Sequence, residues 1–191
     1  MRAVCVFCGS SAGRDPAFRL SATAAGTAIA QAGLSVVYGG GKVGLMGALA
    51  DGALAAGGRA IGVIPRSLVE REIGHAGLSE LHVVETMQER KTKMADLADA
   101  FIALPGGAGT LDEFFEQWTW AQLGIHSKPC GLLNVKGYFG PLISTIERIV
   151  QEGFMAESYS KMLVIEASIE PMLRRFSTYS PPAHKWHAAE A

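Results

Sequence analysis

A glycine-rich loop followed at once by two carboxylates is the stretch best able to do chemistry. In PGGAGTLDE, Pro105 ends an apolar run, three glycines follow within four residues, and Asp112 and Glu113 open an amphipathic segment. Glycines before a helix expose backbone N–H groups that bind anions. A carboxylate one turn away could accept ribose hydroxyls and stabilise an oxocarbenium-like transition state. Breaking the N-glycosidic bond of a nucleotide would need both groups, and the two can share one loop.

A purely structural role is the alternative for Glu113. Thr110 and Glu113 have the spacing of a capping box, with Thr110 as the N-cap and Glu113 three residues into the helix. Acidic residues in a first helical turn also suit the helix dipole. On local grounds alone, the pattern favours the structural interpretation of Glu113.

A basic pair upstream favours the catalytic interpretation. In TMQERKTKMADLA, a helical wheel places Arg90 and Lys91 on the apolar face. That face is defined by Met87, Met94, Leu97 and Ala98, whereas Glu89, Thr92 and Asp96 point away. Cations on a core-facing stripe are costly unless they are paired or reach the rim by snorkelling. We expect their partners to be Glu113, Glu72 or a ligand phosphate.

The elements that must position these residues alternate between strands and helices. Apolar runs predict strands at AVCVFC, LSVVYG, AIGVIP, LHVVE, AFIALP and CGLLNV, with helical segments between most of them. This pattern indicates an α/β fold: a Rossmann-like, doubly wound parallel sheet with helices on both faces. Residues 1–176 are expected to form a single nucleotide-binding domain, and residues 177–191, which lose all periodicity, a loose C-terminal tail. His184 and His187 are expected to be solvated residues of that tail.

Three glycine-rich turns, CGSSAG, YGGGKVG and PGGAGT, each follow a predicted strand. They should meet on one rim of the sheet, where a phosphate-bearing ligand would bind. Ser10, Gly39, Gly40 and Gly41 are therefore further candidates for phosphate contact. The second turn is no P-loop, because Val43 stands where a magnesium-binding Ser or Thr would follow Lys42.

Composition excludes several classes of partner. The 191 residues carry a net charge of −1, which indicates neither nucleic acid nor an anionic membrane as a partner. No apolar run has the ~20 residues of a membrane span, and the N-terminal run, interrupted by Gly9 and Ser10, is not expected to be a signal peptide. Three cysteines, too few for a disulfide-rich protein, favour the reducing cytoplasm. Cys5 and Cys8 should point to opposite faces of a strand, so no metal site is expected.

Two motifs in order carry a family resemblance. PGGAGTLDE, read as P-G-G-x-G-T-x-x-E, and MQERK just upstream resemble the LONELY GUY family of cytokinin riboside 5′-monophosphate phosphoribohydrolases. The resemblance extends through VYGGGKVGLMG, GVIP, WTWAQLGIHSKP and GYFGPL, over most of residues 3–155. It implies a homodimeric hydrolase without metal or cofactor, which releases base and ribose 5-phosphate from AMP or N6-substituted AMP.

The resemblance also implies roles for individual residues. Arg90 and Glu113 would be the catalytic pair. The implied substrate-binding residues are Glu72, Arg90, Lys91, Gly107, Ala108, Gly109, Thr110, Leu111, Asp112, Glu113 and Thr119. Thr119 lies about 120° around the helix from Glu113, so we expect it to meet a ligand only across a dimer interface, or not at all.

Two rival functions remain open. A non-catalytic nucleotide-binding or carrier module could use the same rim and would bind AMP tightly without turnover. The label lysine decarboxylase, sometimes attached to this family, would require pyridoxal phosphate on a lysine and a carboxylate for the ring nitrogen. The sequence shows no motif of that kind.

Overall fold

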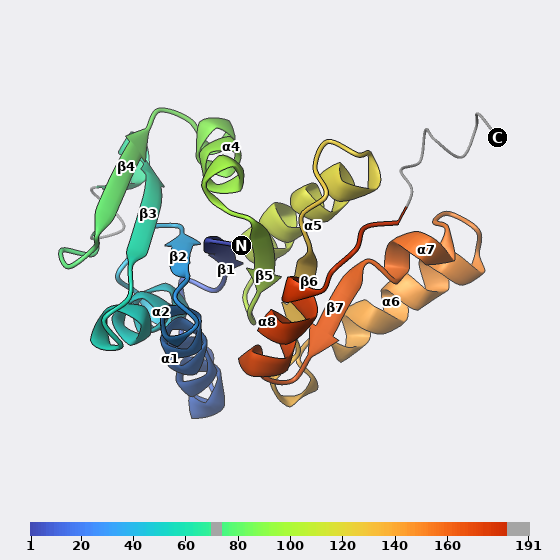
Figure 1. Cartoon of the computed structure of the whole chain (residues 1–191), viewed down its shortest axis with the longest axis horizontal. Helices are drawn as coiled ribbons and strands as arrows, with labels where there is room; N and C mark the ends of the chain where they lie inside the picture. The colour runs from blue at the N-terminus through green and yellow to red at the C-terminus, as the bar shows by residue number, and fades with distance from the viewer. Residues whose placement is uncertain (70–73, 183–191) are drawn as a thin grey trace.

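One seven-stranded parallel sheet organises this computed structural model, which describes residues 1–69 and 74–182 (Figure 1). Its strands are β1 Ala3–Phe7, β2 Ser35–Tyr38, β3 Ala60–Pro65, β4 Glu80–Val84, β5 Ala100–Ala103, β6 Cys130–Leu133 and β7 Leu163–Glu166. They lie in the order β4-β3-β2-β1-β5-β6-β7, and each neighbouring pair is parallel. The predicted Rossmann-like, doubly wound α/β fold is confirmed.

Six of the strands coincide with the predicted apolar runs, and β7 was missed. Only two of the four β7 residues, Leu163 and Val164, are buried, so the strand lacks the long apolar run of a central strand. β4 lies at the other edge of the sheet and leaves Leu81 and Val83 exposed. The prediction of continuously buried strands therefore holds for the centre of the sheet and weakens at both edges.

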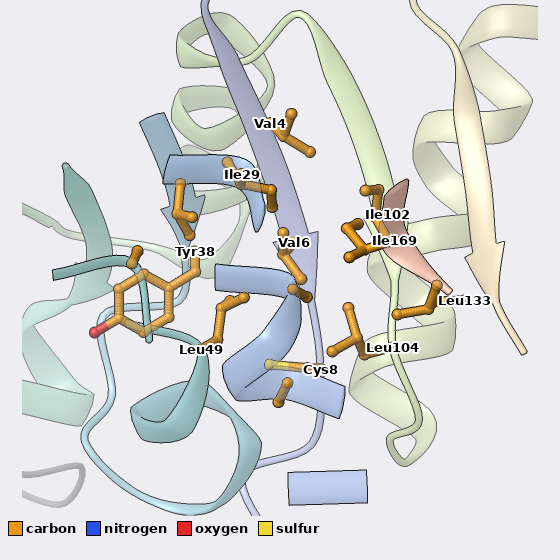
Figure 2. Close-up of a cluster of buried hydrophobic side chains, with 14 of the residues drawn as sticks. Val4, Val6, Cys8, Ile29, Tyr38, Leu49, Ile102, Leu104, Leu133 and Ile169 are labelled. Carbon is orange, nitrogen blue, oxygen red and sulfur yellow. The ribbon is translucent and has the colours of Figure 1, made fainter. Parts of the chain in front are cut away.

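Helices cover both faces of the sheet. Buried residues of α1 Pro16–Gln31, α2 Gly44–Ala55 and α8 Ile169–Ser177 pack into one core cluster, part of which Figure 2 shows around Val4, Val6 and Ile102. Buried residues of α4 Met87–Leu97, α5 Ala108–Gln122 and α6 Gly140–Gln151 pack into the other. The short elements are α3 Arg66–Val69, η1 Val135–Gly137 and α7 Glu157–Ser160. None of the described helices is both long and apolar enough to cross a bilayer.

Cys5 and Cys8 lie in the core clusters on opposite faces of the sheet. Cys5 belongs to the α4 and α5 cluster and Cys8 to the α1 and α2 cluster, and both are free. The predicted divergence of the two thiols is confirmed. Beyond α8, which ends at Ser177, residues 178–182 continue without helix or strand, and His184 and His187 lie outside the described residues.

The strand order creates a switch point between β1 and β5. From β1 the chain adds β2, β3 and β4 on one side, then returns to place β5 on the other side of β1. The connection after β1 leads to α1 on one face, and the connection after β5 leads to α5 on the opposite face. Loops that diverge in this way open a crevice at the carboxyl ends of the strands, where ligands bind in such folds.

Candidate active site

The three glycine-rich turns meet at this switch point. Gly9, after β1, donates its backbone N–H to the carbonyl of Pro105 after β5, at 3.1 Å. The carbonyl of Gly9 accepts the N–H of Leu45, which follows the turn after β2, at 3.0 Å. The predicted gathering on one rim is therefore confirmed, with the first turn joining the other two.

A cavity of about 330 Å³ opens on this rim. Its polar lining comes from Ser10, from residues 107–110 at the start of α5, and from Arg90, Asp112 and Glu113. Cys8, Gly9, Met46 and Met87 complete the lining. The volume suits a small organic ligand, and the donors and carboxylates are those that a phosphorylated sugar requires.

Arg90 and Glu113 both line the cavity and face one another. Their helices, α4 and α5, cover the same side of the sheet (Figure 1). The residues are 8% and 9% exposed, and Arg90 Nη2 lies 3.6 Å from Glu113 Oε1. Burying both charges is tolerable because each offsets the other. The separation exceeds a hydrogen bond, and the buried Nε of Arg90 has no hydrogen-bond partner among the described residues. Arg90 thus keeps donor capacity for an anion.

Helix α5 begins earlier than the capping-box pattern predicted. Its N-cap is Gly107, so Thr110 is the third helical residue and Glu113 lies in the second turn. The capping-box assignment of Thr110 and Glu113 was therefore wrong. The backbone N–H groups of residues 108–110 have no acceptor within the helix, and these three residues line the cavity. The positive end of the α5 dipole is thus directed at the ligand space.

The capping motif occurs instead on α4, which carries Arg90. The Thr86 hydroxyl accepts the N–H of Glu89 at 3.1 Å, and the Glu89 carboxylate accepts the N–H of Glu85 at 2.9 Å. This cap fixes the first turn, and one residue later Arg90 enters the buried face. Glu89, Thr92 and Asp96 are exposed, as predicted. Met87 is exposed as well, because it lines the cavity instead of the core.

Lys91 is held by two carboxylates of α5. Its Nζ lies 3.0 Å from Glu116 Oε1 and 3.4 Å from Asp112 Oδ2. Burial opposes the charge of Lys91, but the bonds to Glu116 and Asp112 outweigh it and raise the pKa of the amine. Asp112 was predicted as a site residue, whereas Glu116 was missed because no local motif marks it.

The remaining predicted residues occupy different environments. Leu111 packs partly buried against the α4 and α5 cluster, and Thr119 is exposed on α5. Gly39, Gly40 and Gly41 are buried and are absent from the cavity lining; a Cβ on Gly39 would lie 2.1 Å from Arg90 Nη2. Gly39 therefore makes room for the guanidinium. Glu72 lies outside the described residues.

Sequence reasoning missed the thioethers and the thiol of the lining. Met46 and Met87 carry no pattern that distinguishes them from core methionines, and Cys8 was interpreted only as a strand residue. Burial raises the pKa of the Cys8 thiol, and the nearby Glu113 carboxylate raises it further. Cys8 therefore contributes a buried thiol to the wall of the cavity.

Comparison with known proteins identifies the family. A family model described as "Possible lysine decarboxylase" matches residues 46–176. The cytokinin riboside 5′-monophosphate phosphoribohydrolase of Rhodococcoides fascians is 50% identical over 170 residues, which cover 88% of this chain and 86% of that protein. The cytokinin riboside 5′-monophosphate phosphoribohydrolase LOG1 of Arabidopsis thaliana is 44% identical over 182 residues, which cover 95% of this chain and 85% of that protein. The chain belongs to the LONELY GUY family.

Solved structures at lower identity share the fold of this LONELY GUY protein. A molybdenum cofactor binding protein from Rippkaea orientalis superimposes with a TM-score of 0.71 at 23% identity, over 93% of this chain and 96% of that one. The Moco carrier protein of Chlamydomonas reinhardtii superimposes with a TM-score of 0.69 at 19% identity, over 93% of this chain and 96% of that one. At these identities the likeness concerns the fold alone.

The family model is named for lysine decarboxylation, a reaction that uses pyridoxal phosphate bound to a lysine. The residues that line the cavity do not fit that cofactor. A cofactor lysine needs an amine whose pKa is lowered. Lys91, beside the cavity, has its pKa raised by two carboxylates instead. No lysine is among the described residues that line the cavity. The described residues that line the cavity therefore offer no suitable anchor for that cofactor.

Proposed function

We propose that the protein hydrolyses the N-glycosidic bond of AMP or N6-substituted AMP, including cytokinin riboside 5′-monophosphates. Water is consumed, and free base and ribose 5-phosphate are released. The observation that carries the proposal is the buried Arg90–Glu113 pair, which shares one cavity with the N-terminus of α5. Relatives 44% and 50% identical, named cytokinin riboside 5′-monophosphate phosphoribohydrolase, support it.

The phosphate would bind at the start of α5. Residues 107–110 present backbone N–H groups and the positive helix end there, and the Ser10 side chain lies across the same cavity. Lys91 adds positive charge behind the loop, although Asp112 and Glu116 already engage it. Leu111 would support this turn from beneath, whereas Glu72 and Thr119 are proposed as further substrate contacts from the family resemblance alone.

Glu113 would act at the anomeric carbon. As the bond to the base lengthens, positive charge develops on the ribose, and a carboxylate beside it stabilises that charge and orients the attacking water. Arg90 would hold the Glu113 carboxylate in position and contact the phosphate with its remaining donors. Because both groups are buried, their electrostatic effect is stronger than it would be in water.

The direct test is a product assay. Purified protein incubated with AMP or N6-isopentenyl-AMP should release equal amounts of base and ribose 5-phosphate, quantified by chromatography and by an enzymatic sugar-phosphate assay. Tight binding of AMP measured by calorimetry, with no product from either nucleotide, would indicate the non-catalytic binding module instead.

We propose in addition that the protein is a homodimer in the cytoplasm. Edge strand β4 exposes Leu81 and Val83, and Met87, which lines the cavity at the start of α4, is exposed as well; exposed apolar side chains of this kind suit an interface with a second copy. The free thiols of Cys5, Cys8 and Cys130 suit a reducing compartment. Light scattering after gel filtration should give twice the mass of the 20.2 kDa chain.

A further inference from the structure

Tyr138, which follows η1, is bonded to the glycine loop that begins α5. Its hydroxyl donates a hydrogen bond to the carbonyl oxygen of Gly106 at 2.6 Å. The side chain lines a second cavity, of about 340 Å³, which lies beside the cavity that holds Arg90 and Glu113 and shares Gly107 with it. Tyr138 belongs to the GYFGPL motif, but the sequence gave it no role in the site. Its bond acts on the loop and not on the charged pair.

The bond fixes the orientation of the peptide group between Gly106 and Gly107. A trans peptide is planar, so its C=O and N–H point in opposite directions. Gly106 and Tyr138 line the second cavity and not the first, so the Gly106 carbonyl is turned to that side. The N–H of Gly107 is turned the opposite way, towards the first cavity, which Gly107 also lines. Because Gly107 is the N-cap of α5, no carbonyl within the helix accepts this N–H.

Two adjacent glycines would otherwise leave this peptide free to rotate. A Cβ on Gly107 would meet nothing within 4 Å, so packing does not confine the residue. Glycine adopts positive φ about as readily as negative φ, so both orientations of the peptide are sterically open. The rotated peptide would direct the carbonyl oxygen of Gly106, instead of the N–H of Gly107, at a bound phosphate. The anion would lose a donor and face a partial negative charge.

The segment that carries Tyr138 is held firmly against α1. Lys136 has a φ of 53°, in the left-handed region that residues other than glycine rarely adopt. Such strain persists where the surrounding structure imposes it. Lys136 pairs with Asp15, the N-cap of α1, and the Tyr138 ring meets that of Phe18 edge to face, with centroids 5.7 Å apart. This wall of Phe18 and Tyr138 sets the position from which the hydroxyl reaches Gly106.

We propose that Tyr138 is a positioning residue of the phosphate site. Its hydroxyl holds the peptide between Gly106 and Gly107 in the orientation that presents the N–H of Gly107 to the phosphate of the substrate. The inference rests on the proposed function, in which residues 107–110 bind that phosphate. Tyr138 acts through the loop and does not touch the substrate. Its contribution is therefore to phosphate binding and not to cleavage at the anomeric carbon.

Tyr138→Phe tests this role, because it removes the hydroxyl and keeps the ring against Phe18. We expect the Kd of ribose 5-phosphate, measured by calorimetry, to rise about tenfold, the effect of about one hydrogen bond to a charged group. For AMP, KM should rise by a similar factor while kcat changes by less than about twofold, because the phosphate is bound equally in the ground and transition states. Tyr159→Phe, the same change on α7 outside both cavities, is the matched control and should leave all three constants unchanged.

The division between KM and kcat separates positioning of the phosphate from a general structural role. A loosened site would lower kcat, because Glu113 would lose its alignment. A fall in kcat for AMP with KM unchanged, equal losses in both, or an unchanged Kd for ribose 5-phosphate in Tyr138→Phe would each overturn the inference and leave the proposed function intact. If the wild-type protein released no ribose 5-phosphate from AMP, the proposed function would fail, and calorimetry with ribose 5-phosphate would still decide the role of Tyr138. Failure of the wild-type protein to bind ribose 5-phosphate would overturn the inference.

Discussion

At the residue scale, the site depends on two opposite charges that are buried together. Arg90 and Glu113 are each less than a tenth exposed, and neither would be tolerated in that environment alone. The sequence showed this only indirectly, by placing a cation on an apolar helix face. The structure explains how the cation is accommodated, since Gly39 leaves the space that its guanidinium occupies.

Gly39 provides a prediction at this scale. In Gly39→Ala the new methyl group would overlap Arg90 Nη2, 2.1 Å away, and displace the guanidinium from Glu113. Because misplacement of a catalytic group by about 1 Å can cost about 100-fold, we expect kcat/KM for AMP to fall by roughly that factor while the far-UV circular dichroism is retained.

A double-mutant cycle is the control for this prediction. In an Arg90→Ala background there is no guanidinium to displace, so adding Gly39→Ala should change kcat/KM little further. If the two effects on activity were instead additive, Gly39 would influence activity by a route other than Arg90.

At the element scale, helix starts determine what each side chain can do. The Thr110–Glu113 spacing resembles a capping box. However, the N-cap of α5 is Gly107, whose backbone is extended, and the helix begins at Ala108. Glu113 is thereby moved from the cap into the second turn, where it faces Arg90. Sequence spacing alone could not decide this, since it fixes the distance between two residues but not the turn in which they lie.

The crossing of α1 and α2 gives the prediction at this scale. A Cβ on Gly26 of α1 would lie 2.0 Å from the carbonyl oxygen of Leu49, and one on Gly52 of α2 would lie 2.3 Å from the carbonyl oxygen of Thr23. Although Ala is the better helix former by about 1 kcal/mol, we expect Gly26→Ala to lower the free energy of unfolding by about 1–3 kcal/mol through overpacking.

Urea unfolding monitored by circular dichroism would measure this loss. Gly140→Ala is the control, because a Cβ at this first residue of α6 would meet nothing within 4 Å. That variant should be neutral or slightly more stable. Equal stability of Gly26→Ala and Gly140→Ala would contradict the close approach of α1 and α2.

At the scale of the whole molecule, the sequence predicts the fold class and the rim because buried strands and glycine turns have strong local patterns. Chain topology supplies what those patterns cannot. The pairing of Lys91 with Glu116, the wall of Phe18 against Tyr138 and the edge strand β7 all arise from segments brought together by the sheet order. Contacts between segments distant in the sequence produce no recognisable spacing pattern.

A partly buried histidine, His126, links this packing to pH. The His126 ring lies 5.2 Å from that of Phe101. Burial, with the charge of Lys128, lowers the pKa of His126 from 6.5 to about 4. Between pH 6.5 and about pH 4, His126 binds a proton in the unfolded chain but not in the folded protein. Stability should therefore be complete above about pH 6.5 and decline as the pH falls towards 4.

His126→Asn should flatten this decline. Asparagine has no titrating proton and can accept the N–H of Lys128, which His126 Nδ1 accepts at 3.2 Å. The measurement is the unfolding free energy in urea at several pH values between 4 and 7, for wild type and variant. An equal loss of stability on acidification in both proteins would show that other groups cause it.

The central claim, that Glu113 stabilises charge on the ribose, is tested most directly by Glu113→Gln. Glutamine keeps the shape and removes the charge, so we expect turnover of AMP and N6-isopentenyl-AMP to fall by two or more orders of magnitude, about 3 kcal/mol of transition-state stabilisation, in a folded protein. Glu116→Gln, one turn further along α5 and paired with Lys91, should reduce turnover only a few-fold. If Glu113→Gln retained wild-type turnover, the carboxylate would be structural, and the chemistry would belong to other residues of the rim.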